Sequence, residues 1–244
     1  MEKKEWFVDW FDSKYYHLLY KNRNMQEAEQ FVDKLVAHLN FKKNTQALDL
    51  GCGKGRHATQ LKKHYDNVTG IDLSIESINQ AAKNKIKGLT FSQQDMRDFK
   101  LESNVDIIFN LFTSFGYFNA KGDNLKVLNN CYNQLNKNGH LIIDFFNADK
   151  VRLSLIKQEN KIINGINFKI ERTIQDNKVI KTISFKDSNK LFFFEEKVQL
   201  LTLDDFKNLL AKANFKLTKY FGNYNLAPFE TNSSDRLILF AQKK

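Results

Sequence analysis

The sequence predicts an α/β fold, in which a parallel sheet carries helices on both faces, together with a small inserted antiparallel sheet. Two observations predict it. Over residues 46–147, short apolar runs alternate with glycine- or acid-bearing turns and with segments of helical periodicity. Over residues 162–201 the apolar residues recur at every second position instead, and the first pattern then returns.

A glycine-rich turn follows the first apolar strand. The strand, Ala47–Leu50, runs into glycines at alternate positions, Gly51, Gly53 and Gly55, and helical periodicity starts at Ala58. Glycines allow positive φ and let a ligand lie against bare main chain. The first amides of the following helix favour an anion. The pattern therefore predicts a ligand-binding βαβ unit.

Two classes of ligand use such a turn. A dinucleotide site has the pattern G-x-G-x-x-G, but Arg56 stands where its third glycine would be. Instead, Asp49-x-Gly51-x-Gly53-x-Gly55 resembles motif I of the class I S-adenosylmethionine (SAM) dependent methyltransferases. In that family the acid and the glycine backbone hold the amino-acid end of SAM. The resemblance implies a seven-stranded Rossmann-like sheet, with SAM as cofactor and S-adenosylhomocysteine as product.

The second predicted strand, Asn67–Asp72, ends in an acid about 20 residues beyond the glycines. That spacing places the carboxylate of Asp72 at the end of the neighbouring parallel strand, where it can accept both ribose hydroxyls of a nucleoside. Ser74 follows as the predicted N-cap of a helix over Ile75–Lys83.

A third short strand, Leu89–Ser92, precedes Asp95-Met96-Arg97, which resembles the D-M-R segment of the same family. The resemblance implies that Asp95 takes the adenine amino group and that Met96 forms an apolar wall beside the ring. The alternative is that Asp95 is a solvated loop carboxylate.

The fourth strand, Val105–Asn110, is apolar enough to be buried on both faces. The aromatic loop over 111–118 follows it, and ligands of open α/β sheets lie beyond the carboxyl ends of the strands. We therefore expect this loop to border the transferred methyl group. The amino-methyltransferases of DNA and glutamine carry Asn-Pro-Pro-Tyr here, and Asn110-Leu111-Phe112-Thr113 disfavours that substrate class. A helix over Asn124–Leu135 and a fifth strand over Leu141–Phe146 complete this half.

The stretch Trp6–Asn24 is rich in aromatic residues and precedes the first strand, so we expect it to pack over the domain as a helical cap. Aromatic residues at this spacing also suit a plain core role. In the resembling methyltransferases a similar segment folds over the methionine end of SAM, which implies contacts from Tyr16, Tyr20 and Arg23. An amphipathic helix is predicted over Met25–Leu39.

The alternating segments Ile162–Ile174, Val179–Phe185 and Leu191–Leu201 are separated by turn residues. They divide the chain into a core, 1–150 and 201–244, and an insertion, 151–200. The resemblance to small-molecule methyltransferases implies that the insertion is a lid over the active site. It could instead be a stabilising appendage or the surface of a homodimer.

The core pattern resumes at Thr202, a predicted helix N-cap with Asp205 at the third helical position. Two further strands, Phe215–Phe221 and Arg236–Ala241, are expected to form the antiparallel hairpin that closes the sheet. Tyr224 and Arg236 lie near its loops and could face the substrate, the solvent or the core.

Composition narrows the function. The 244 residues carry a net charge of +10, yet the lysines are spread along the chain without a basic block, so nucleic-acid binding is not favoured. The sequence contains no apolar run of the roughly 18–20 residues that a membrane span needs. With no signal-peptide pattern at its start and only Cys52 and Cys131, we expect a cytoplasmic protein with neither disulfide nor metal site. Cys52 as a nucleophile is the alternative.

We therefore expect a SAM-dependent methyltransferase that acts on a small molecule with an N, O or C nucleophile, by SN2 displacement. An RNA methyltransferase, favoured only by net charge, and a non-catalytic SAM-binding domain are the alternatives. His17 and Tyr117 are the candidate general bases. The expected cofactor contacts are Tyr16, Tyr20, Arg23, Asp49, Gly51, Cys52, Gly53, Gly55, Arg56, Asp72, Leu73, Asp95, Met96, Asn110 and Leu111.

Overall fold

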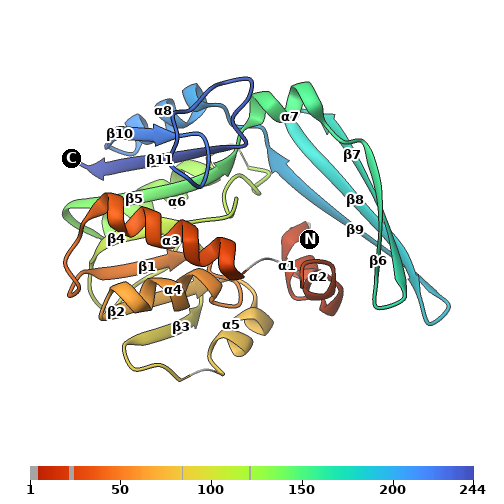
Figure 1. Ribbon diagram of the computed structural model, residues 1–244, viewed down its shortest axis with the longest axis horizontal. Helices are drawn as coiled ribbons and strands as arrows, with labels where there is room; N and C mark the ends of the chain where they lie inside the picture. The colour runs from red at the N-terminus through yellow and green to blue at the C-terminus, as the bar shows by residue number, and fades with distance from the viewer. Residues whose placement is uncertain (1–4, 22–24, 84, 121) are drawn as a thin grey trace.

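The computed structural model describes residues 5–21, 25–83, 85–120 and 122–244, and its central element is a seven-stranded sheet (Figure 1). The strand order is β10-β11-β5-β4-β1-β2-β3. The five strands from β3 to β5 are parallel. β11 is antiparallel to β5, and β10 is antiparallel to β11, so β10 runs in the same direction as the five parallel strands. The strands are β1 (Gln46–Leu50), β2 (Asn67–Asp72), β3 (Leu89–Gln93), β4 (Val105–Asn110), β5 (Leu135–Phe146), β10 (Phe215–Phe221) and β11 (Arg236–Lys243).

Helices cover both faces of this sheet. On one face α3 and α4 bury Leu35 and Leu61 against strand residues such as Ile107. On the other, α6 and α8 bury Leu128 and Phe206. The helices are α1 (Trp6–Phe11), α2 (Lys14–Leu19), α3 (Met25–Leu39), α4 (Arg56–His64), α5 (Ile75–Ala81), α6 (Asp123–Gln134), α7 (Ala148–Ser154) and α8 (Leu203–Lys212). The predicted fold class is confirmed.

A second, four-stranded antiparallel sheet follows β5 and α7 in the chain. Its strands are β6 (Gln158–Ile163), β7 (Ile166–Gln175), β8 (Lys178–Asp187) and β9 (Lys190–Gln199). The first predicted alternating segment, Ile162–Ile174, is divided between β6 and β7 by a turn at Asn164 and Gly165, both of which have positive φ. This sheet lies within the expected insertion, whose boundaries at 151 and 200 stay a prediction.

The N-terminal helices α1 and α2 lie between the two sheets (Figure 1). Trp10, Tyr15 and Leu19 are buried against the second sheet, in one apolar cluster with Phe168 and Ile183. The predicted cap therefore exists, and the second sheet supports it from behind.

Four predicted elements have the observed bounds, namely Met25–Leu39, Asn67–Asp72, Val105–Asn110 and Phe215–Phe221, and most of the others differ by one or two residues at an end. The largest difference is in β5, which begins at Leu135 and not at Leu141. Leu135 pairs with Val105 of β4, and the ladder is irregular before Ile107 pairs with His140. The intervening residues are polar, and Asn138 has a φ of 61°. An apolar pattern cannot reveal this extension, because only the pairing with β4 defines it.

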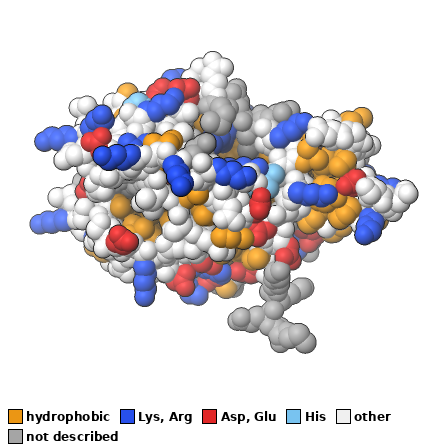
Figure 2. Space-filling view, turned by 90° about the horizontal axis from the view of Figure 1, so that it is seen from below, with side chains coloured by type: hydrophobic (Ala, Val, Ile, Leu, Met, Phe, Trp, Pro, Cys, Tyr) orange, Lys and Arg blue, Asp and Glu red, His pale blue; other side chains and the backbone are white. Residues whose placement is uncertain are grey.

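Lysine and arginine side chains are scattered among acidic ones on the face shown in Figure 2. Among the helices that the structure describes, none has the length and apolar character needed to cross a membrane. In the same part of the chain, no group of three His, Cys, Asp or Glu side chains is placed to hold a metal ion.

Candidate functional site

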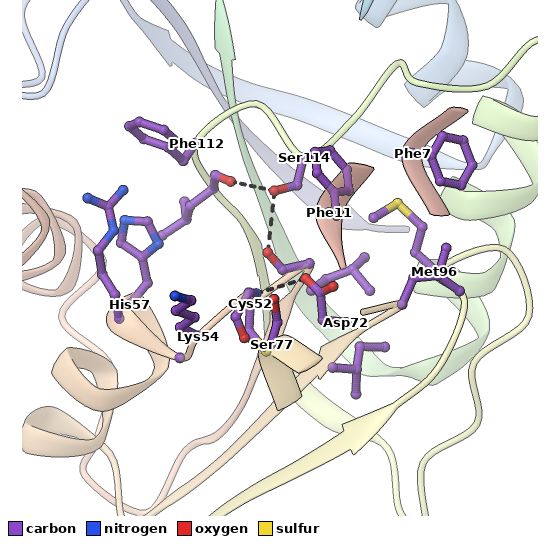
Figure 3. Close-up of a pocket in the computed structure, with 18 of the residues that line it drawn as sticks. Phe7, Phe11, Cys52, Lys54, His57, Asp72, Ser77, Met96, Phe112 and Ser114 are labelled. Atoms are coloured by element: carbon purple, nitrogen blue, oxygen red, sulfur yellow. Dashed lines mark hydrogen bonds between the residues drawn. The ribbon is translucent and has the colours of Figure 1, made fainter. Parts of the chain in front are cut away.

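A pocket of about 430 Å³ opens at the carboxyl ends of β1, β2 and β4, beneath α1 and α2 (Figure 3). In that view Lys54, His57 and Phe112 lie at one side, and Phe7 and Met96 lie at the other. Fourteen of the predicted site residues line the pocket: Tyr16, His17, Tyr20, Gly51, Cys52, Gly53, Gly55, Arg56, Asp72, Leu73, Asp95, Met96, Leu111 and Tyr117.

The glycine-rich loop forms the floor, and two of its glycines are required by close packing. A Cβ on Gly51 would lie 2.8 Å from the Cβ of Ser114, and one on Gly55 would lie 2.6 Å from the ring of Phe91. Gly53 has a φ of 53°, and a Cβ there would meet nothing within 4 Å. Its backbone is therefore open for a ligand to approach.

Asp72 ends β2 and holds the loop in place. Its Oδ2 accepts the Gly53 N–H at 2.8 Å, and its Oδ1 accepts the Ser74 N–H at 2.9 Å. Burial raises the pKa of Asp72, and the backbone donors oppose that rise. Each carboxylate oxygen has a second lone pair, so the group can still accept ribose hydroxyls from the pocket side.

Asp49 lies behind the loop and does not line the pocket. Only 1% of its surface is exposed, and it accepts a hydrogen bond from the Ala58 amide in the first turn of α4. Within the described residues, its Oδ2 atom is buried and has no hydrogen-bond partner. Asp49 thus supplies the side-chain cap that Gly55, the N-cap of α4, cannot supply. Its contact with SAM stays a prediction.

Asp49 makes the stability of the unliganded protein pH-dependent. Burial raises its pKa to about 7, and the nearby Asp72 carboxylate adds to the rise. Because the pKa in an unfolded chain is about 3.9, the folded protein binds the extra proton between about pH 4 and pH 7. The stability from that proton is fully present below about pH 4 and is lost as the pH rises through 7.

We therefore expect Asp49→Asn, which is neutral at every pH, to gain stability over the wild type by about 2–4 kcal/mol between pH 4 and pH 8. Urea unfolding of both proteins across this pH range measures the difference. Asp66→Asn is the control, since this exposed loop substitution should stay within about 0.5 kcal/mol of the wild type. Parallel stability curves for Asp49→Asn and the wild type would contradict the buried, proton-binding role.

Asp95 reaches the pocket, but its carboxylate is occupied by Arg97. Nε of Arg97 donates to both oxygens at 3.0 and 3.1 Å, and Nη2 donates to Oδ2 at 2.6 Å. The same guanidinium bridges Glu5, the N-cap of α1, and Asp123 of α6, and it stacks over Phe118 at 4.9 Å. Adenine recognition by the Asp95 side chain would therefore compete with Arg97. The sequence did not reveal this cluster of one guanidinium and three carboxylates, because its members are up to 118 residues apart.

The cap brings Tyr16, His17 and Tyr20 to the pocket, and Arg23 lies outside the described residues. The Tyr20 hydroxyl donates to Oε1 of Glu196 on β9 at 2.6 Å, so it also ties the cap to the second sheet. Tyr117 donates its hydroxyl proton to the backbone carbonyl of Thr113. A hydroxyl that donates in this way is a weak general base.

Two further predicted residues, Asn110 and Cys52, are buried. Asn110 is 1% exposed, lies behind the pocket and donates its Nδ2 proton to the Leu50 carbonyl at 2.8 Å. Cys52 is 6% exposed, and burial raises the pKa of its thiol well above the usual range. Its thiol therefore stays protonated at neutral pH, which argues against a nucleophilic role.

The structure adds pocket residues that the sequence analysis missed, chiefly Lys54, His57, Ser77 and Gln94. The Arg56 guanidinium lies over the Phe112 ring at 4.6 Å. Three of the missed residues sit in the glycine-rich loop or in the first turns of α4 and α5, directly after strands that end at the pocket. The sequence could have identified these three residues as pocket residues, because each follows the end of a predicted strand.

Comparison with known proteins agrees with this geometry. Over 105 residues the chain is 31% identical to a dTDP-3-amino-3,4,6-trideoxy-α-D-glucopyranose N,N-dimethyltransferase from Streptomyces venezuelae. That match covers 42% of this chain and 43% of the relative, so it spans less than half of the relative's length.

Two solved structures share the fold over nearly the whole chain. A SAM-dependent methyltransferase from Clostridium acetobutylicum superposes with a TM-score of 0.78 at 20% identity, covering 94% of this chain and 96% of that one. A SAM-bound amino pentose methyltransferase from Micromonospora echinaspora gives 0.69 at 17% identity, covering 95% and 98%.

The sequence profile of the methyltransferase-domain family matches residues 41–214, which is most of the chain and includes every strand of the pocket. The resemblance to class I SAM-dependent methyltransferases is thereby confirmed, with SAM as the cofactor of that family. The protein belongs to the methyltransferase-domain family.

Proposed function

We propose that this protein transfers a methyl group from SAM to a small-molecule acceptor, and that an amine of an amino sugar is the first acceptor to test. The methyltransferase-domain family supports the reaction class. The amino-sugar acceptor is supported by the similarity to the Streptomyces venezuelae N,N-dimethyltransferase and the Micromonospora echinaspora amino pentose methyltransferase.

The observation that carries this proposal is the pocket itself. Its volume of about 430 Å³ lies within the roughly 300–1,000 Å³ of small-molecule sites. The strand ends and the glycine-rich loop form one side, and α1 and α2 close the other. A roofed pocket of this size suits a cofactor and a metabolite better than a nucleic-acid strand.

The residues present fit SAM. Asp72 stands where it can accept ribose hydroxyls, Met96 and Phe7 offer apolar walls, and the open backbone at Gly53 admits the amino-acid end. The Oδ2 atom of Asp49, which has no hydrogen-bond partner in the described part of the chain, lies behind that loop, and the carboxylate adds negative charge when it is ionised. We assign cofactor binding to these residues.

The bound sulfonium would supply an electrophilic methyl group, and the chain must align the acceptor and exclude water. Alignment alone can contribute roughly 7–11 kcal/mol in ideal cases. Phe112, Phe11 and Tyr117 line the pocket with apolar rings, which suits both tasks. A neutral amine attacks through its own lone pair, so this acceptor class makes small demands on His17 or Tyr117 as a base.

Turnover with labelled SAM tests the proposal. The purified protein would be incubated with SAM and a panel of amino sugars, free and nucleotide-linked, and S-adenosylhomocysteine and methylated product would be measured by mass spectrometry. We expect N-methylated product from at least one amine. SAM binding without turnover on any acceptor would support a non-catalytic SAM-binding domain. Turnover on RNA alone would support an RNA methyltransferase.

The role of the second sheet and the oligomeric state of the protein are also matters of proposal. Among the described residues, the pocket is lined by α1 and α2 and by no residue of β6–β9. We therefore propose that the second sheet acts as a lid indirectly, by supporting those helices. Its outer face exposes Ile162, Leu191 and Phe193, which is where we place the contact of a possible homodimer.

A further inference from the structure

The loop after β4 forms the pocket wall opposite Asp72 and has a strained backbone. Phe112 and Thr113 both have left-handed φ angles, 58° and 60°, although neither is glycine. A β-branched residue such as Thr113 is an outlier in this region, and strained residues persist only where their surroundings hold them. Phe112 and Ser114 face the pocket from this loop (Figure 3).

One buried residue, Asp144, holds both strained residues. Oδ2 of Asp144 on β5 accepts the Phe112 N–H at 2.9 Å, and its backbone carbonyl accepts the Thr113 N–H at 2.9 Å. Asp144 is 0% exposed and does not line the pocket. It therefore supports the loop from behind.

The guanidinium of Arg236, at the start of β11, completes the support. Nε of Arg236 donates to Oδ1 of Asp144 at 2.8 Å, and Nη2 donates to Oγ1 of Thr113 at 2.9 Å. Tyr224 covers the pair: its hydroxyl donates to Oδ2 of Asp144 at 3.3 Å, and Arg236 lies 5.4 Å over its ring. Arginine suits this role, because the planar guanidinium presents several donors in a fixed fork and can donate to two acceptors at once.

We propose that Asp144 and Arg236 are positioning residues, which hold Phe112 against the pocket through the backbone amides of Phe112 and Thr113 and the hydroxyl of Thr113. The alternative is that the pair merely stabilises the β5–β11 junction. That junction already has a continuous ladder from Arg236–Phe146 to Gln242–His140. The fork, in contrast, reaches beyond the junction to a loop that borders the pocket.

Thr113 separates the two explanations, because changing it leaves the ion pair intact. Thr113→Val keeps the shape and the branched Cβ but removes the oxygen that accepts from Arg236. Thr113→Ser keeps that oxygen. Asp106→Asn is the matched control: Asp106 also accepts a backbone N–H, from Gln46 at 2.9 Å, but at the amino end of the strands, away from the pocket.

This inference rests on the proposed function, so the first measurement is turnover. We expect Thr113→Val to lower kcat about 10- to 100-fold, since a small misplacement of the reacting groups has effects of this size. The SAM dissociation constant should stay near the wild-type value. Thr113→Ser and Asp106→Asn should keep the wild-type kcat.

Amide hydrogen exchange provides a readout that needs no acceptor. We expect faster exchange of the amides of residues 112 and 113 in Thr113→Val than in Thr113→Ser, with exchange in β5 and β11 unchanged. If the wild type turns over and the two variants match in kcat and in exchange, the positioning role is wrong while the proposed function stands. If Thr113→Val exchanges faster than Thr113→Ser but the wild type methylates no acceptor, the support of the loop by Asp144 and Arg236 stands and the proposed function is wrong.

Discussion

Replacing Asp72 with alanine should weaken SAM binding by about 1.5–3 kcal/mol, or roughly 10- to 150-fold in the dissociation constant. Two losses combine. The ribose hydroxyls lose a charged acceptor, and the Gly53 amide loses the Oδ2 atom that fixes the loop at 2.8 Å. Isothermal titration calorimetry with SAM and with S-adenosylhomocysteine measures the effect.

Asp106→Ala is the control for this experiment. Asp106 also accepts a backbone amide and a side-chain amide, from Gln46 at 2.9 Å and Asn136 at 2.7 Å, at the opposite edge of the sheet. Its loss should alter stability and leave SAM affinity unchanged. Wild-type affinity in Asp72→Ala, or an equal loss in Asp106→Ala, would show that the ribose assignment is wrong.

The sequence predicted those elements whose signal is local. Val105–Asn110 is buried on both faces, and the observed strand has the predicted bounds. Thr202 was predicted as an N-cap with Asp205 at the third helical position, and the structure has both hydrogen bonds of a capping box between them. Asp72 was placed at the pocket because the carboxyl ends of neighbouring parallel strands share one edge of the sheet.

The sequence could not show which partners a polar side chain meets across the fold. Asp95 was assigned to adenine from its motif, yet Arg97 binds it and joins Glu5 to Asp123. Asp49 belongs to the same motif as the glycines, but it faces the start of α4 and not the pocket. In both cases a local pattern places the residue, and tertiary contacts decide what its oxygens bind.

The contacts between the second sheet and the cap are the clearest example of tertiary partners that the sequence could not show. They also lead to the largest expected effect on stability. Oε1 of Glu196 on β9 accepts the Trp10 Nε1–H at 2.8 Å and the Tyr20 hydroxyl at 2.6 Å. Its Oε2 lies 3.2 Å from Nζ of Lys181, and both side chains are less than 20% exposed. One carboxylate therefore joins the second sheet to both helices of the cap.

Glu196→Ala should cost about 3–5 kcal/mol, the range for leaving one charge of a buried pair without its partner. Lys181 would be left uncompensated, and burial already lowers its pKa. Because Tyr16 and Tyr20 of the cap line the pocket, we also expect weaker SAM binding. Denaturant unfolding and calorimetric titration measure the two effects.

Glu195→Ala is the matched control, one residue away on the opposite face of β9. Glu195 pairs with Lys197 at 2.7 Å, and both side chains are about one-third exposed, so its loss should cost no more than about 1 kcal/mol. If Glu196→Ala loses stability but keeps wild-type SAM affinity, the sheet stabilises the protein without supporting the roof of the pocket. If stability and SAM affinity both fall in Glu196→Ala and neither falls in Glu195→Ala, the second sheet acts on the pocket through the cap that lies between the sheet and the pocket.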